Sequence, residues 1–196
     1  MVVISSGHGL HVPGARGIID EVMEARRTVD HVAAALVALN CPVFAFHEET
    51  ARNARDNLNA VIRHHNGHKR ALDISVHFNS FSPVSDFVQQ SGFRQVDRAV
   101  GVEVLYFTGN SHTKGLAGRV AANIAKASGL QLRHPATSGA KPRDNLGFLR
   151  HTTAPAILLE VCFVNSSVDV QLYRDNFEDI CQAIAATINT GLETII

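Results

Sequence analysis

The chain has 196 residues, 45% of them hydrophobic, and its 18 basic residues balance 18 acidic ones. This length suits one good-sized core or two small ones, and the even charge indicates that nucleic acid is not a partner. No apolar run reaches the ~20 residues that cross a bilayer, so we expect no stable membrane insertion. Three scattered cysteines form no disulfide framework: Cys41, Cys162 and Cys181.

The first half of the chain alternates short apolar stretches, typical of buried strands, with amphipathic stretches typical of helices. Strands are predicted at Val2–Ser5, Val43–His47 and Ala71–His77. Helices are predicted at Asp20–Leu39 and Ala51–His65. Residues Asn79–Gly101, rich in Ser, Gln and Asp, are predicted to be a long inserted loop.

The second half continues the alternation. Strands are predicted at Val102–Phe107 and Ala156–Val164, and helices at Thr113–Ser128 and Val168–Thr190. Residues Gln131–Asn145 contain two prolines and a glycine and are predicted to be a loop. Strands that alternate with helices indicate an α/β fold with a largely parallel sheet. We therefore expect residues 1–196 to form a single domain.

Histidine, a common metal ligand, follows two of the predicted strands. His8 lies in a glycine-flanked turn after the first strand, and His77 ends the third strand on the face of Asp73 and Ser75. Ligands bind at the carboxyl ends of the strands in such sheets, so both imidazoles should meet at one edge. Taken singly, each residue would also fit an ordinary turn histidine or a satisfied core histidine.

A zinc ion that performs chemistry usually has three protein ligands and one open position, and two histidines with one carboxylate are a common set. The candidate carboxylates are Glu21 and Glu24, at the start of the first predicted helix. Glu21 lies roughly 40° from the centre of the apolar stripe and Glu24 about 100° away. Glu21 is expected to point inward as the ligand, and Glu24 is the second choice. Both would also suit the positive end of the helix dipole without a metal.

One carboxylate, Glu160, interrupts the apolar strand Ala156–Val164. Burying an ionised carboxylate without a partner costs several kcal/mol or more. Zinc with two neutral imidazoles and one carboxylate keeps a charge of about +1, which would provide that partner. Glu160 could then take a proton from an attacking water and deliver it to a leaving nitrogen. The competing explanation is a structural ion pair with Arg143 or Arg150.

Two other features have simpler explanations. Cys162 shares a face with Glu160 and could be the nucleophile of a cysteine hydrolase with His77 as base, but a small buried hydrophobe is the favoured interpretation. The cluster His64, His65 and His68 lies near the end of the second predicted helix, where positive charge is favourable.

Several segments, in order along residues 2 to about 190, resemble the zinc-dependent N-acetylmuramoyl-L-alanine amidases of the amidase-3 group, which includes AmiC-like enzymes and phage endolysins. Each segment is weakly specific, whereas the ordered set is specific. The segments are Gly7-His8-Gly9, Gly17–Arg26 around Glu21, Ser75-Val-His77-Phe-Asn79, Gly101–Tyr106, and Leu149–Asn165 around Glu160.

The resemblance implies a mixed six-stranded sheet flanked by helices and one Zn²⁺ held by His8, Glu21 and His77. It also implies hydrolysis of the amide between N-acetylmuramic acid and L-alanine in peptidoglycan, with Glu160 catalytic. Apart from what the resemblance implies, Asn79, Arg143 and Arg150 are candidates for contact with the substrate. The two arginines could meet carboxylates of a stem peptide, and a solvated surface position is the equal alternative for both. The alternatives are an inactive peptidoglycan-binding module of the same fold and another zinc amidohydrolase or peptidase that acts on wall peptides.

The chain departs from this family pattern in two places. Residues 79–101 are longer than the expected link and could cover or narrow the substrate groove. The family's catalytic domain often occurs with a separate wall-binding domain, and we expect none in residues 1–196. The N-terminus has no signal-peptide pattern, so we expect synthesis in the cytoplasm and action on the cell wall, as in a phage or prophage endolysin or an autolysin.

Overall fold

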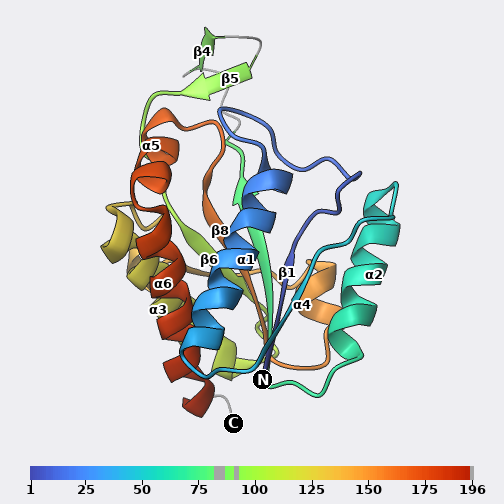
Figure 1. Cartoon of the computed structure of the whole chain (residues 1–196). Coiled ribbons are helices and arrows are strands. Elements are labelled where there is room, and N and C mark those ends of the chain that lie inside the picture. The colour runs from blue at the N-terminus through green and yellow to red at the C-terminus, as the bar shows by residue number, and fades with distance from the viewer. Residues whose placement is uncertain (82–86, 91–92, 195–196) are drawn as a thin grey trace.

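Six strands form one twisted sheet in the computed structural model, which describes residues 1–196 except 82–86, 91–92 and 195–196 (Figure 1). Their spatial order is β2 (Val43–Phe46), β1 (Val2–Ser6), β3 (Leu72–Asn79), β8 (Ala156–Phe163), β6 (Glu103–Tyr106) and β7 (Ala140–Pro142). The first four run parallel, whereas β6 is antiparallel to β8 and parallel to β7. The predicted α/β class with a mixed, mostly parallel six-stranded sheet is therefore confirmed.

Helices cover both faces of the sheet (Figure 1). One face is covered by α1 (Glu21–Ala38), α3 (Ser111–Ser128) and α6 (Phe177–Gly191), and the other by α2 (Ala54–Asn66) and α4 (Gly147–His151). The remaining helices are α5 (Ser167–Asp175), η1 (Pro135–Thr137) and η2 (Leu192–Thr194). In the described part of the chain, no helix has both the length and the apolarity to cross a bilayer.

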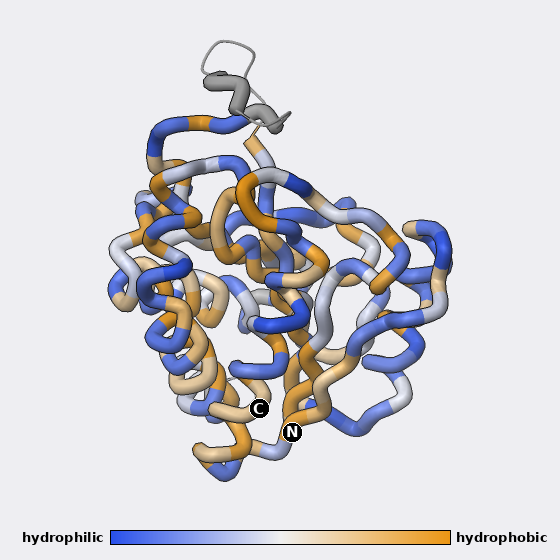
Figure 2. Tube along the Cα trace, turned by 45° about the horizontal axis from the view of Figure 1, so that its top comes forward, coloured by the Kyte–Doolittle hydropathy of each residue, from blue (hydrophilic) through white to orange (hydrophobic). Residues whose placement is uncertain are grey.

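The core is divided by the sheet into a large and a small cluster. Leu159 of β8 packs into the large cluster with α1, α3 and α6, whereas its neighbour Leu158 packs into the small cluster with Val61 and Phe148. Figure 2 shows hydrophobic residues concentrated along the central strands, with hydrophilic residues in many outer turns. Burial on both faces explains why the β8 sequence is nearly continuously apolar.

The predicted final helix, Val168–Thr190, is wrong as one element. The segment forms α5 and α6, which meet at Asn176 with φ −121° and ψ 23°. The Asn176 side-chain amide donates to the carbonyls of Leu172 (2.9 Å) and Ser128 (3.3 Å). These bonds stabilise a turn at Asn176, because a short polar side chain competes with the helix for backbone partners.

The predicted loop Gln131–Asn145 contains η1 and the edge strand β7. Three residues with a proline give no strand pattern, yet an edge position tolerates proline because its N–H is not needed for pairing. Helix α4 follows and was not predicted, since five residues are too few to show periodicity.

Part of the predicted inserted loop 79–101 forms an antiparallel hairpin of β4 (Phe87–Gln90) and β5 (Phe93–Val96). Residues 82–86 and 91–92 of this segment lie outside the described residues. The covering of a groove by this segment therefore stays a prediction.

The strand order contains a topological switch point. From β1 the chain first moves outward to β2 and then crosses back to β3 on the other side of β1. Connections leave β1 in opposite directions at this point, which opens a crevice at the carboxyl ends of β1 and β3. The turns that carry His8 and His77 lie at these two strand ends.

A buried hydrogen-bond chain holds α2 against β1 and β3. His65 of α2 binds Asp73 of β3 through Nδ1 (2.8 Å) and Ser5 of β1 through Nε2 (2.9 Å), and all three residues are buried. Arg70 donates from Nε to Asp73 at 2.7 Å. Serine, histidine and aspartate connected in this order resemble a hydrolase triad, but full burial leaves a substrate no access.

We predict that His65→Ala lowers the free energy of unfolding by about 2–4 kcal/mol, because a buried ring is lost and two buried polar groups lose a partner. Urea unfolding should show a lower midpoint at an unchanged slope. His112→Ala is the matched control, since His112 is exposed. Equal stability of the two variants would show that the buried chain contributes nothing.

Candidate metal centre and active site

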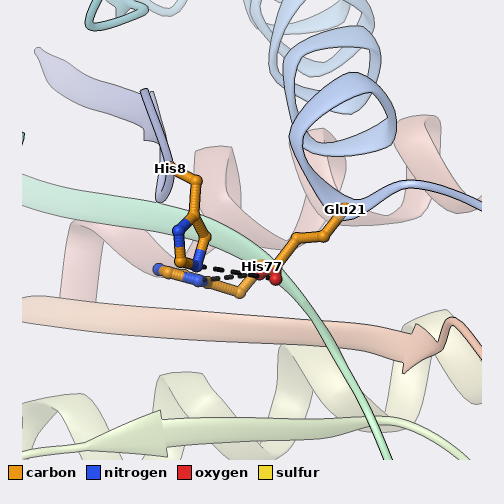
Figure 3. Close-up of side chains that lie close together, drawn as sticks. All are labelled: His8, Glu21 and His77. Carbon is orange, nitrogen blue, oxygen red and sulfur yellow. Dashed lines mark hydrogen bonds and ion pairs between the residues drawn. The ribbon is translucent and has the colours of Figure 1, made fainter. Parts of the chain in front are cut away.

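Three side chains meet at the switch point in an arrangement suited to a metal ion. His8, Glu21 and His77 each offer one ligand atom, and these atoms all lie within 4.8 Å of one another. His77 Nδ1 lies 3.0 Å from Glu21 Oε1, and His8 Nε2 lies 3.5 Å from Glu21 Oε2. Figure 3 shows both imidazoles pointing toward the carboxylate, which extends from the first turn of α1.

Local sequence explains how Glu21 is positioned. Asp20 is the N-cap of α1, and its carboxylate accepts from the backbone N–H of Val22 at 2.9 Å. The cap fixes where the helix begins, so the next residue, Glu21, points inward and is only 3% exposed. Its carboxylate also accepts from the backbone N–H groups of Phe78 (3.1 Å) and Ala15.

Two glycines leave the space that this group occupies. A Cβ on Gly7 would lie 1.9 Å from the His77 imidazole, and a Cβ on Gly14 would lie 2.5 Å from Glu21 Oε2. Neither contact is sterically possible without a shift of the ligand groups. Glycine at these two positions therefore allows the backbone to approach the site closely.

The charge states fit a metal as well as the geometry does. Burial alone would raise the pKa of Glu21. Its hydrogen bond to His77 and its electrostatic interactions with His77 and His8 outweigh this effect and lower the pKa, so the carboxylate is an anion. Burial lowers the pKa of His8, which keeps this imidazole neutral, and its Nδ1 is buried without a hydrogen-bond partner. For His77, burial lowers the pKa, but the bond to Glu21 and the nearby carboxylates outweigh it and raise the pKa.

An anionic carboxylate and two imidazoles are a donor set that divalent metals such as zinc accept. The group could therefore hold a metal ion, with protons displaced from any charged imidazole on binding.

Glu24, the second choice of ligand, points elsewhere. Its Oε2 accepts from the Tyr173 hydroxyl at 2.8 Å and lies 3.6 Å from Arg27 Nη1. It is not a member of the His8, Glu21 and His77 group. Its partners belong to α1 and α5, so Glu24 links these helices.

Glu160 lies beside the group. On β8 it pairs in register with His77 of β3, and partners in register share a face of the sheet. Its Oε2 is buried with no hydrogen-bond partner among the described residues. Burial raises the pKa of Glu160 to about 7; the charge of His77 opposes this, whereas the charges of Glu21 and Glu103 add to it.

Among the described residues, Glu160 has no hydrogen bond or ion pair with the residues that were expected to pair with it or to contact a substrate. Arg143 and Arg150 are both exposed, and within the described residues no ion pair connects either of them to Glu160. Asn79 donates from Nδ2 to Glu103 Oε1 at 3.0 Å, so its amide is used within the protein. The structure thus does not show the structural ion pair that competed with a catalytic role for Glu160.

Sequence reasoning missed a second buried carboxylate, Glu103, and its partners. Glu103 of β6 pairs in register with Glu160 and contacts Arg133, His134 and Lys141. The available signal was the same as for Glu160, a carboxylate within an apolar strand. The partners gave no signal, because they lie in a segment that was predicted to be a loop.

Cys162 does not support a cysteine hydrolase. It is completely buried, and burial raises the pKa of its thiol well above the usual range. A neutral, inaccessible thiol is not a nucleophile at physiological pH. The favoured interpretation of a small buried hydrophobe agrees with this environment.

Known proteins similar to the chain include two from Clostridium perfringens. One, an uncharacterized protein from strain 13 / Type A, is 27% identical to this chain over 191 residues. The matched segment is 96% of this chain and 51% of that protein. The other, an uncharacterized 38.4 kDa protein, is 25% identical over 203 residues, 99% of this chain and 54% of that protein. The chain therefore spans about half the length of these relatives.

Solved structures share the fold. The CwlD amidase from Clostridioides difficile, solved in complex with the GerS lipoprotein, superposes with a TM-score of 0.76 at 17% identity and 98% coverage of both chains. The catalytic domain of CwlV, an N-acetylmuramoyl-L-alanine amidase from Bacillus (Paenibacillus) polymyxa var. colistinus, gives 0.73 at 24% identity and 98% coverage of both. The catalytic domain of the CD27L endolysin, which targets Clostridia difficile, gives 0.70 at 20% identity and 96% coverage of both.

The model of one protein family matches nearly the whole chain, from residue 2 to residue 192. Its description is N-acetylmuramoyl-L-alanine amidase. The match includes His8, Glu21, His77 and Glu160, the four residues that converge at the switch point. The chain therefore belongs to the amidase-3 family of N-acetylmuramoyl-L-alanine amidases.

Proposed function

We propose that the chain is a zinc-dependent hydrolase that cleaves the amide between N-acetylmuramic acid and L-alanine in peptidoglycan. The observation that carries the proposal is the His8, Glu21 and His77 group with Glu160 beside it, whose buried Oε2 has no hydrogen-bond partner among the described residues. Membership of the amidase family supports the choice of peptidoglycan as substrate.

In this proposal His8, Glu21 and His77 hold the metal. When bound, Zn²⁺ supplies Lewis acidity, which polarises a carbonyl group and makes a water molecule more acidic. The bonds from Phe78 and Ala15 to the Glu21 carboxylate hold that ligand in place before any metal arrives. Such preorganisation by neighbouring groups is what a metal site needs for affinity.

Glu160 is the proposed general base and acid. Its carboxylate accepts a proton from the water that attacks the carbonyl carbon, and then donates this proton to the leaving nitrogen of L-alanine. Burial raises its pKa to about 7, which makes the neutral form more accessible, and a cation held by the neighbouring ligands lowers the pKa again. Both protonation states are thus within reach near neutral pH.

The place of action follows from the substrate, since peptidoglycan lies outside the cytoplasmic membrane. We propose synthesis in the cytoplasm and action on the cell wall, as an endolysin or an autolysin. The names of the solved relatives include an endolysin and an amidase in complex with a lipoprotein, so the same fold occurs in more than one context.

We predict that the purified protein loses hydrolysis of purified peptidoglycan on treatment with EDTA or phenanthroline and regains it with Zn²⁺. His8→Ala, His77→Ala and Glu21→Ala should each lose the metal, since a ligand is removed. Metal content can be measured by elemental analysis of the dialysed protein.

Glu24→Ala is the matched control, because Glu24 lies on the same helix turn but binds Tyr173. It should retain the metal. Loss of zinc in this variant, with retention in Glu21→Ala, would show that the wrong glutamate has been assigned.

We predict that digestion of peptidoglycan releases new amino groups of L-alanine and no new reducing sugar ends. Hydrolysis of the lactyl amide frees the amino group of L-alanine and the lactyl carboxyl group, and it leaves the glycosidic bonds intact. The products can be labelled at their amino groups and identified by mass spectrometry. New reducing ends would indicate a glycosidase, and free D-alanine alone would indicate a carboxypeptidase.

We predict that Glu160→Gln lowers turnover by about 10²–10⁴, the usual contribution of positioned proton transfer, while zinc stays bound. Glutamine keeps the size and hydrogen-bonding capacity of glutamate but cannot accept the proton. Turnover and zinc content should be measured on the same sample. A well-folded, zinc-replete variant with full activity would contradict the assigned role, and a zinc-free variant would make Glu160 a ligand.

The same variant has a second readout in the metal-free protein. The folded-state pKa of Glu160 is raised from 4.5 to about 7, so its ionisation destabilises the fold as the pH rises through 7. At pH 8 Glu160→Gln should be more stable than the wild type by up to ~3 kcal/mol, and at pH 5 the difference should fall below ~1 kcal/mol. A variant that is less stable at pH 8 would indicate a structural ion pair.

A further inference from the structure

A row of charged side chains continues from the candidate site across the sheet. In register, His77 of β3 pairs with Glu160 of β8, and Glu160 pairs with Glu103 of β6. Neighbouring strands lie about 5 Å apart, so this row extends over roughly 10 Å. Lys141 of the edge strand β7 extends it further, with Nζ 3.2 Å from Glu103 Oε2.

Glu103 lies beneath a set of basic side chains that we call the cationic cluster: Arg133, His134 and Lys141. Glu103 itself is 2% exposed. His134 Nε2 lies 2.8 Å from Glu103 Oε2, and Arg133 Nε lies 3.6 Å from Glu103 Oε1. Asn79 donates to the same carboxylate. The cluster is therefore anchored to the protein by one buried acid.

The cationic cluster is partly exposed and carries more positive charge than Glu103 alone neutralises. The side chains of Arg133, His134 and Lys141 are 27%, 35% and 25% exposed, whereas the Glu103 side chain is 2% exposed. Arginine and lysine are permanent cations, so these two outnumber Glu103, the carboxylate that anchors them, and ionised Glu160, which interacts with Arg133, offsets part of this excess. Their exposed edges form a positive surface next to Glu160.

Arg133 is also held in a defined position. Its guanidinium carbon lies 4.5 Å from the centre of the Phe163 ring, and this stacking fixes the plane of the guanidinium. Its Nη1 is buried and has no hydrogen-bond partner in the described part of the chain, while the side chain as a whole is partly exposed. A guanidinium fixed by stacking, with an exposed edge, is suited to recognise a carboxylate.

We propose that the cationic cluster is a subsite for a carboxylate on the peptide part of the substrate and decides which wall peptides are cleaved. The inference rests on the proposed function. An extended peptide spans about 3.3–3.6 Å per residue, so a carboxylate roughly 10 Å from the reacting amide belongs to the second or third residue of the peptide. Binding of this carboxylate at the subsite would position the scissile amide next to Glu160.

The test uses two substrates that differ only in charge. One is N-acetylmuramoyl-L-alanyl-D-glutamic acid, and the other is the same compound with both glutamate carboxyl groups amidated. In the wild type, KM for the acid should be about 10- to 100-fold lower than KM for the diamide, as expected for a charge-assisted hydrogen bond. In Lys141→Gln and Arg133→Gln most of this preference should disappear through a higher KM for the acid, with kcat nearly unchanged.

Controls separate recognition from structure. Lys141→Arg keeps the charge and should keep the preference for the acid. Lys126→Gln removes an exposed lysine on α3 and should change neither KM. If the cluster serves only to neutralise Glu103, Lys141→Gln and Arg133→Gln will change the kinetics of both substrates alike. This result would overturn the inference.

The outcomes also distinguish failure of the subsite from failure of the proposed amidase activity. If the wild type cleaves both compounds with equal KM, the subsite is wrong while the proposed amidase activity stands. If the wild type cleaves neither compound and does not digest purified peptidoglycan, the proposed function fails and the subsite fails with it.

Discussion

The buried carboxylate of Glu21 is the contact on which the rest of the site depends. It accepts hydrogen bonds from His77, from the backbone of Phe78 on β3, and from the backbone of Ala15. A buried charge is tolerated only when it is paired and hydrogen-bonded, so these donors have to be in place for α1 to begin where it does. The same bonds connect the first helix, the third strand and the turn that follows His8. The site is therefore a consequence of satisfying one buried anion.

Glu160 has the opposite environment, and the contrast separates the roles of the two carboxylates. Several donors lower the pKa of Glu21 below its ordinary value, which suits a permanent anion. Burial without such donors raises the pKa of Glu160 to about 7, which suits a group that exchanges protons. Neighbouring acids whose environments move their pKa values apart are a recurring basis for assigning acid and base functions. Here the distinction comes chiefly from the His77 hydrogen bond to Glu21, with a smaller contribution from the Ala15 N–H, and from the absence of a donor to Glu160 Oε2 among its described neighbours.

The α/β fold and the convergence of His8, Glu21 and His77 could be predicted from the sequence, because strand periodicity, helical geometry and the rule for strand ends are all local patterns. The direction of Glu21 as opposed to Glu24 followed from the helical stripe alone. The cationic cluster could not be predicted, since it depends on β7 and the adjoining loop folding back beside β6, and pairing between distant segments leaves no periodic signal. The break at Asn176 was missed because the apolar spacing continues through it, while the side-chain bonds that stop the helix involve a residue 48 positions earlier.

The position of β8 has a consequence for how the protein is assembled. This strand is the last of the sheet along the chain, yet it lies between β3 and β6 and joins the two parts of the sheet. Residues 1–79 contain His8, Glu21 and His77, and residues 103–142 contain Glu103, Arg133, His134 and Lys141, so the strand pairing that joins the two parts cannot form until β8 has been synthesised. Such long-range pairing makes folding slow, because distant segments have to meet before the contacts form. Glu160 arrives with the same strand that closes the sheet, so a chain that ends before β8 has no carboxylate paired in register with His77.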